Sequence, residues 1–194
     1  MSGLKENGDR ICTLALWSNN LRDADAALVN IYQACLEAGP LVCRIHEDSV
    51  PKIDARVNTL LEKLRTEPIA FFSEQTGLYG EVTYTIAKLV IFSTLYTPHS
   101  TGRALTDALA ELEKGNAEPL WNMNTIYKKY NVEDLTCDCP AVPPVPFATD
   151  VTASIACSDG NVINATVDDI RKSFEEVAEV SEFAEHWLMH LFCA

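Results

Sequence analysis

The sequence predicts a mostly α-helical protein, a bundle of about six to seven helices with one or two short strands. Apolar residues recur at helical spacing through most of the chain, as in Ile53, Val57 and Leu60. Glycine and proline residues divide these stretches into segments with the usual lengths of helices. A single β-type apolar run comes late, at Thr152–Asp159, and Gly160 closes it. The helical pattern therefore dominates, and the strand is an addition to it.

Three segments in the first half of the chain have helical periodicity. Asp23 or Asp25 can cap the first of them, and Pro51 suits the first turn of the second. The third contains one charged residue, Lys88, and such all-round apolarity predicts a helix buried between other elements. Ile69–Tyr79 precedes it and is expected to form a short extended segment and a turn. The expected helices are Trp17–Leu36, Val50–Arg65 and Val82–Tyr96.

The rest of the chain contains further helical segments separated by proline and glycine. Pro98 is expected to end the apolar helix, and Ser100 or Thr101 then starts a fourth helix that Gly115 closes. Ser181 is expected to cap the last helix. The predicted helices are Ser100–Lys114, Pro119–Tyr130, Val167–Val180 and Glu182–Phe192.

These elements predict a division of the chain into several parts. The segment 136–150 contains four prolines, which exclude a helix or a β-ladder and predict a stiff linker. The strand after it needs a pairing partner, since a single strand leaves its backbone groups unsatisfied. We expect that partner in a second copy of the chain, or within the chain at Ile69–Phe72. The predicted parts are a flexible N-terminus at 1–16, a helical domain at 17–135, the linker at 136–150, and a strand with a helical pair at 151–194.

The composition argues against several classes of partner. The net charge of −13, from 15 basic and 28 acidic residues, leaves no cationic surface for nucleic acid or for an anionic membrane. The longest apolar run, Ile86–Leu95, contains Lys88 and is too short to span a bilayer. Met1–Arg10 lacks the apolar stretch of a signal peptide, so the chain as written is expected to stay in the cytoplasm. The hydrophobic content of 47% is typical of a globular protein.

The cysteine content indicates a different compartment. Seven cysteines are many for a cytosolic protein of this length. Cys35 and Cys43 flank the turn Gly39-Pro40, and a bridge between them would close a short loop and contribute about 2–3 kcal/mol if unstrained. Asn164 begins an N-glycosylation sequon, which has meaning only in a secreted chain. The cysteines and the sequon together suggest secretory ancestry and leave the localisation open.

Six stretches of the chain, taken in order, carry a family resemblance. They are Asp23–Cys43, Val57–Pro68, Val82–Tyr96, Ala104–Gly115, Ser154–Gly160 (SIACSDG) and Ser181–Ala194. In their order and spacing they resemble the TAP-like (tripeptidyl-aminopeptidase-like) group of fungal and actinobacterial α/β-hydrolases, within the peptidase S33 type. The resemblance covers nearly the whole chain from Trp17 onward. It implies that the helical part is the lid of this fold and that SIACSDG is the first core strand after the lid.

The resemblance also shows where this chain departs from the family. The family's nucleophile stands in a Gly-x-Ser-x-Gly elbow before the lid, and no such motif occurs in this sequence. The family's acid and base come from loops after later core strands, which would lie beyond Ala194. No catalytic residue is therefore carried over. For secreted relatives the resemblance implies two disulfides, Cys35–Cys43 and Cys157–Cys193.

Two histidines four residues apart are weak candidates for metal ligands. His186 and His190 would share one face of the last helix, with Glu182 one turn earlier as a third ligand. They do not form an H-E-x-x-H motif, and two amphipathic side chains at the edge of a helix have the same spacing. Cys193 follows His190 by three residues but has no visible orienting group. We therefore expect neither a metal nor another cofactor.

The aromatic residues of the helical part are the candidate contacts for a ligand. A lid lines a substrate cleft with such side chains, and plain core packing is the alternative. The aromatic set is Tyr79, Tyr84, Phe92, Tyr96 and Trp121, and the last four are the candidates for ligand contact. We expect a lid-type domain without hydrolase activity of its own, which binds an apolar small molecule, a hydrolase core or a second copy of itself as a dimer. The alternatives are a stand-alone enzyme of the cyclase or isomerase type with an apolar cavity, and a fragment of a full-length serine peptidase.

Overall fold

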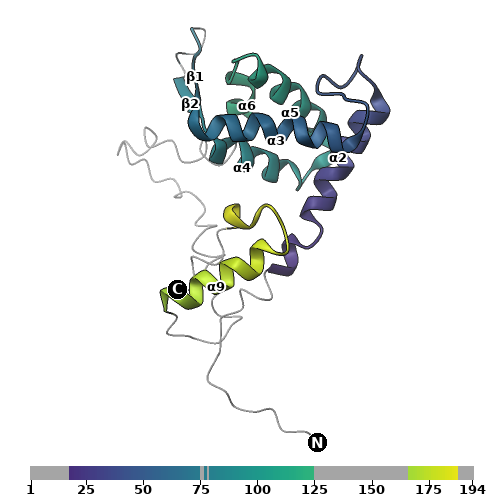
Figure 1. Ribbon diagram of the computed structural model, residues 1–194. Helices are drawn as coiled ribbons and strands as arrows, with labels where there is room; N and C mark the ends of the chain where they lie inside the picture. Colours follow the sequence, from purple (N-terminus) through teal and green to yellow (C-terminus); the bar gives the residue numbers. More distant parts are fainter. Residues whose placement is uncertain (1–17, 75–76, 78, 125–165, 188–194) are drawn as a thin grey trace, which may run out of the picture. The chain divides into compact units, whose positions relative to one another are not determined.

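The computed structural model describes residues 18–74, 77, 79–124 and 166–187. This part of the chain is mostly helical with one two-stranded sheet, which confirms the predicted fold class (Figure 1). None of its helices is long and apolar enough to span a membrane. The elements are η1 (Ser18–Leu21), α2 (Ala24–Ala38), α3 (Val50–Thr66), β1 (Ile69–Phe72), β2 (Tyr79–Val82), α4 (Tyr84–Thr94), α5 (Pro98–Glu113), α6 (Glu118–Met123), α9 (Val167–Ala178) and η3 (Ala184–His186).

The chain consists of two compact units. One spans Ala24–Asp138 and contains α2 to α6 with the two strands; we call it the helical unit. The other combines residues 1–23 with 139–194 and contains η1, α9 and η3. The predicted N-terminus at 1–16, the linker at 136–150 and the strand Thr152–Asp159 lie outside the described residues.

Helices α2 and α3 follow the predicted periodicity, but α2 begins later than expected. It starts at Ala24 and not at Trp17, with Asp25 in its first turn, and the 3-10 helix η1 precedes it. Asn19 and Asn20 precede this start, and asparagine favours turns over helix interiors because its side chain competes for backbone hydrogen bonds. Helix α3 has the predicted proline in its first turn and ends at Thr66.

Helices α4 and α5 both begin at positions that differ from the prediction. Val82 belongs to β2, and α4 starts after Thr83, whose hydroxyl accepts a hydrogen bond from the Ile86 N–H at 3.3 Å. Pro98 was expected to break the preceding helix, but it is the first residue of α5. Proline has no N–H, and its φ angle is already helical, so it fits the first turn without losing a hydrogen bond.

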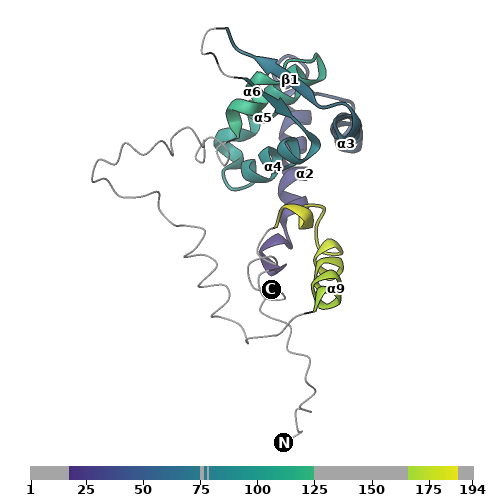
Figure 2. The ribbon, with the colours of Figure 1, turned by 90° about the vertical axis from the view of Figure 1, so that its left-hand side faces the viewer.

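The extended segment predicted after α3 is the first strand of a β-hairpin. Strands β1 and β2 pair antiparallel, from Ile69 opposite Val82 to Phe72 opposite Tyr79. Figures 1 and 2 show the hairpin at the same end of the helical unit as α6. Because side chains alternate across a strand, Phe71 points to the helices, where β2 contacts α4 and α6. The opposite side of the sheet is exposed; we call it the hairpin face, and it consists of Ala70, Phe72, Tyr79 and Glu81.

The core of the helical unit lies around α4. This helix contacts α3, α5, α6 and β2, in agreement with its apolar sequence, and even Lys88 is only 4% exposed. Helix α2 packs on α3 and α5. At the crossing of α2 and α5, Gly102 faces Ile31. The fully buried side chains include Ile45, Ile53, Leu64, Val82, Ile91, Leu105, Leu109, Leu112 and Leu120.

An arginine ties the loop between α2 and α3 to the end of α5. Arg56 Nε and Nη2 donate to the two carboxylate oxygens of Glu113, at 2.7 and 2.6 Å. Arg56 Nη1 donates to Glu47 Oε1 at 3.2 Å and to the carbonyl oxygen of His46 at 3.5 Å. The hydrogen bonds to Glu113 raise the pKa of Arg56. Bidentate pairs of this kind are the stronger class of ion pair, so Arg56 fixes the loop to two helices.

Glu111 forms a second polar junction near the end of α5. Lys114 Nζ donates to Glu111 Oε1 at 3.1 Å, the Arg44 guanidinium donates to the same oxygen, and Asn116 Nδ2 donates to Oε2 at 3.3 Å. These hydrogen bonds, the one from Lys114 first, lower the pKa of Glu111 from 4.5 to about 2. The ionised carboxylate of Glu111 thus connects Arg44, in the loop between α2 and α3, to the last turn of α5.

Acid is expected to weaken this junction. Because the folded pKa of Glu111 lies below the unfolded value, its contribution to stability is present above pH 4.5 and is lost as the pH falls from 4.5 towards 2. We expect the free energy of unfolding to fall more steeply in this window for the wild type than for Glu111→Gln. Urea denaturation at a series of pH values measures the difference. Two parallel pH profiles would contradict the prediction.

In the second unit, α9 and η3 contact one another. Helix α9 lies within the predicted segment Val167–Val180. The prediction of an α-helix at Glu182–Phe192 is wrong in its described part, residues 182–187, where a three-residue 3-10 helix forms. Ser181 Oγ accepts a hydrogen bond from the Phe183 N–H at 3.1 Å. The serine therefore stabilises a tight turn, and this turn takes the place of the first turn of an α-helix.

Candidate functional site

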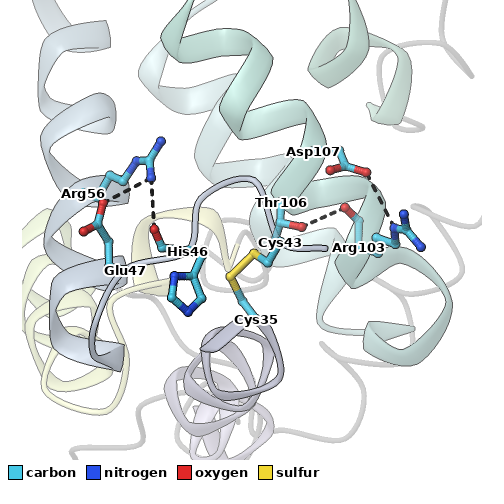
Figure 3. Close-up of a disulfide and its surroundings, with 8 residues drawn as sticks. All are labelled: Cys35, Cys43, His46, Glu47, Arg56, Arg103, Thr106 and Asp107. Carbon is cyan, nitrogen blue, oxygen red and sulfur yellow. Dashed lines mark hydrogen bonds and ion pairs between the residues drawn. A yellow bond between two sulfur atoms is a disulfide. The ribbon is translucent and has the colours of Figure 1, made fainter. Parts of the chain in front are cut away.

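A disulfide joins the end of α2 to the loop that follows it. Cys35 and Cys43 are bonded, with their Cα atoms 5.2 Å apart (Figure 3). Gly39 turns the chain between them with a φ angle of +76°, which a residue with a side chain rarely adopts. The Cys43 N–H then donates to the Gly39 carbonyl at 2.9 Å. Both cysteines are 4% exposed, so the bond is part of the packed interior.

A cavity of about 280 Å³ lies against this disulfide, between α2 and the first half of α5. We call it the disulfide pocket. Its buried floor is apolar and includes Ile31 and the two bonded cysteines, while His99 and Arg103 stand at its exposed rim. The remaining lining residues are Ala34, Ala38, Val42, Pro98, Gly102 and Thr106.

A larger groove of about 640 Å³ lies between α3, the start of β1 and the end of α5. Two cations and two anions line it, and they pair with each other: Arg56 with Glu113 at 2.6 Å, and Lys63 with Glu67 at 3.8 Å. Its apolar residues are Leu60, Pro68, Ile69, Ala70 and Leu112. The groove therefore has room for a ligand but no net charge to select one.

The four aromatic residues predicted as ligand contacts do not gather at one place. The Arg65 guanidinium lies over the Tyr84 ring at 3.4 Å. Phe92 is buried and meets the exposed Tyr96 edge-on, with ring centroids 5.7 Å apart. Trp121 packs on Phe71 of the hairpin, with centroids 5.6 Å apart. None of the four lines either of the two cavities described above.

Two further aromatic residues are on the surface: Tyr79, which belongs to the aromatic set noted in the sequence, and Phe72, which sequence reasoning missed. Phe72 and Tyr79 are directly opposite each other on the hairpin face, 66% and 73% exposed. Side chains alternate between the two faces of each strand, and this alternation places Phe72 and Tyr79 on the outer face. Each strand has four residues, so the alternation is too short to recognise in the sequence, and the pairing register is needed to see it. Phe71 on the inner face packs on Trp121 and is only partly exposed, whereas Phe72 and Tyr79 on the outer face are mostly exposed. Large exposed apolar side chains side by side are typical of an interaction surface.

The candidate metal ligands are only partly described. His186 is buried, its Nδ1 lies 3.7 Å from Glu185 Oε1, and His190 is outside the described residues. Without an α-helix at 182–187, the helical spacing that placed Glu182 and His186 on one face does not apply. Across the described ranges, no three or more His, Cys, Asp or Glu side chains are arranged to hold a metal ion.

Several other predicted residues can be placed and some cannot. His46 lies in the loop between α2 and α3, and His99 lies in the first turn of α5. The cysteines Cys157 and Cys193 and the sequon residue Asn164 lie outside the described residues. Comparison of the chain with protein-family models, with curated proteins and with solved structures finds no match.

Proposed function

We propose that the helical unit is a lid-type binding module, related to the lids of TAP-like α/β-hydrolases, which acts by association and not by hydrolysis. The observation that carries the proposal is the hairpin face. Phe72 and Tyr79 form a cross-strand aromatic pair that is more than half exposed on a well-packed scaffold. Aromatic side chains are enriched at the centres of protein interfaces because they bury a large area with little loss of conformational entropy.

The occupant that fits this face best is a second copy of the chain. In the part that the structure describes, the sheet has two strands, so each strand has an outer edge that no other described strand pairs. Such an edge is a template for strand addition, and a two-fold axis lets one surface pair with itself. Pairing at the strand edges alone leaves the faces of a sheet open, so the two hairpin faces would have to stack on each other across the axis to cover Phe72 and Tyr79 of both copies. Glu81 on the same face and the charge of −13 oppose close approach, so salt should favour the dimer.

Sedimentation of the full chain over a wide concentration range tests the proposal. We expect a reversible dimer whose dissociation constant rises by about tenfold or more in the double variant Phe72→Ser/Tyr79→Ser, since hot-spot aromatics contribute roughly 1–2 kcal/mol each. Val29→Ser is the matched control, because Val29 is 48% exposed on α2 and does not belong to the hairpin face. Higher salt should tighten association of the wild type.

The outcomes of this experiment separate clearly. A monomer at every concentration would reject self-association. A dimer that the double variant forms as tightly as the wild type would reject the hairpin face as the interface. A hydrolase core that binds the wild type but not the double variant, with no dimer present, would replace the second copy as the partner.

The non-hydrolytic part of the proposal has its own measurement. The full chain should neither cleave peptide p-nitroanilides nor react stoichiometrically with a fluorophosphonate, because it lacks the Gly-x-Ser-x-Gly elbow that activates a serine. Labelling of any serine in a one-to-one ratio would overturn this part, whatever the oligomeric state.

A further inference from the structure

The disulfide pocket combines an apolar floor with a basic rim. Ile31 and the bonded pair Cys35 and Cys43 form the floor, each at most 6% exposed. His99 and Arg103 are four residues apart near the start of α5, about one helical turn, and stand on the exposed side. A cavity of about 280 Å³ is at the lower end of the size of small-molecule sites.

The charge at this pocket is opposite to the charge of the chain. Arg103 and His99, but no aspartate or glutamate, are among its lining residues, although aspartate and glutamate outnumber lysine and arginine by 28 to 15 in the whole sequence. The α3–β1 groove differs, because its two cations pair with two carboxylates that also line it. Asp107, which pairs with Arg103 at 3.9 Å, is not among the residues that line the disulfide pocket. The disulfide pocket is thus the cavity whose local charge favours an anion.

Arg103 is in a position to bind such an anion. Its Nε forms an ion pair with Asp107 Oδ2 at 3.9 Å, which is too long for a hydrogen bond, and the Arg103 side chain is 76% exposed. An exposed pair of this kind contributes little, so it does not hold the guanidinium in place. Figure 3 shows Arg103 and Thr106 on α5, with the Thr106 hydroxyl directed to the Arg103 carbonyl oxygen at 2.9 Å. Thr106 therefore satisfies its hydroxyl within the helix. The guanidinium can turn to a carboxylate, which it binds in a two-pronged geometry.

From this combination we propose that the disulfide pocket binds a small amphipathic carboxylate, with its apolar part on Ile31 and the disulfide and its carboxylate on Arg103 and His99. The proposal concerns residues that the hairpin face does not share, and it goes beyond association of the module. The disulfide is part of the floor of the site, and it also holds Cys43 and the neighbouring lining residue Val42 close to the end of α2. Reduction of the bond should therefore weaken binding.

Calorimetric titration of the full oxidised chain with octanoate, below its micelle concentration, tests the site. We expect saturable binding that weakens about tenfold in Arg103→Gln, since a hydrogen-bonded charge pair is worth roughly 1.5 kcal/mol or more. Lys52→Gln removes the same charge from a residue that pairs with Asp48 and lines neither cavity, and it should bind as the wild type does. Gly102→Leu should abolish binding, because its side chain would fill the pocket beside Ile31.

Octanol, which has the same apolar part without the charge, is the matched ligand and should bind at least tenfold more weakly than octanoate. Equal binding of the two compounds would overturn the proposal, and so would equal losses in Arg103→Gln and Lys52→Gln. Absence of octanoate binding would overturn it as well. The Phe72→Ser/Tyr79→Ser variant should keep full octanoate binding, so failure of the hairpin interface and failure of this pocket are distinguishable.

Discussion

Removal of the disulfide, in the double variant Cys35→Ala/Cys43→Ala, is expected to lower the free energy of unfolding by about 2–3 kcal/mol in an oxidised preparation. The bond closes a short loop, with a sequence separation of 8, and this loop no longer restricts the unfolded chain once the bond is lost. For a unit of this size the midpoint of thermal denaturation should fall by roughly 10 °C. Alanine is the chosen replacement because both sites are buried and a serine hydroxyl would add a cost of its own.

The same measurement under reducing conditions is the control. Without the bond, the wild type and the double variant should unfold at nearly the same denaturant concentration, since the remaining difference is two buried thiols. An unchanged melting temperature in the oxidised preparation, with both wild-type thiols open to alkylation, would contradict the prediction.

Substitution of Gly80 by alanine is expected to destabilise the helical unit by about 1–3 kcal/mol. A Cβ atom at this position would lie 2.8 Å from Phe71 Cε1 and 3.0 Å from Trp121 Cε2, closer than packed carbon atoms approach each other. Either the Phe71–Trp121 contact must open or the hairpin must move away from α6. Loss of the fixed environment of Trp121 should be visible in its fluorescence, and urea denaturation gives the change in free energy.

Gly102→Ala is the matched control, and its expected effect has the opposite sign. Its Cβ would meet Ile31 at 3.7 Å, an ordinary contact, and alanine suits the interior of α5 better than glycine. We expect a gain of about 0.5–1 kcal/mol. If both substitutions destabilise equally, the difference in packing between the two glycines is not as described, and the prediction for Gly80 fails with it.

The local elements of the helical unit could be predicted from the sequence. The periodicity of α3 and the proline in its first turn identified that helix almost to the residue. The all-round apolarity of α4 indicated its burial, and the structure surrounds it with α3, α5 and α6. The spacing of Cys35 and Cys43 around Gly39 pointed to a short closed loop at the end of α2. Each of these features depends on residues within about one helix of each other, so the sequence alone contains the information.

Other features depend on residues that are distant in the sequence, and the tertiary structure decided them. A proline can end one helix or begin the next, and the sequence around Pro98 is compatible with both. The packing of α5 decides that Pro98 begins this helix. Among the aromatic candidates Phe92 meets Tyr96. Tyr84 lies under Arg65 and Trp121 packs on Phe71, so these two have partners outside the set. Composition identifies aromatic residues, but it does not say which of them meet.

The candidate binding surfaces are the clearest case of this division. Phe72 and Tyr79 become an exposed pair only through the register of the hairpin, and a slip of one residue would turn them to the inner face. Arg103 and the disulfide line one cavity only because α2 and α5 pack against each other. Thus the sequence by itself determined the helical class and the positions of the longer helices, through contacts between near neighbours. The tertiary structure decided which side chains share a surface, because those contacts join segments that periodicity does not relate.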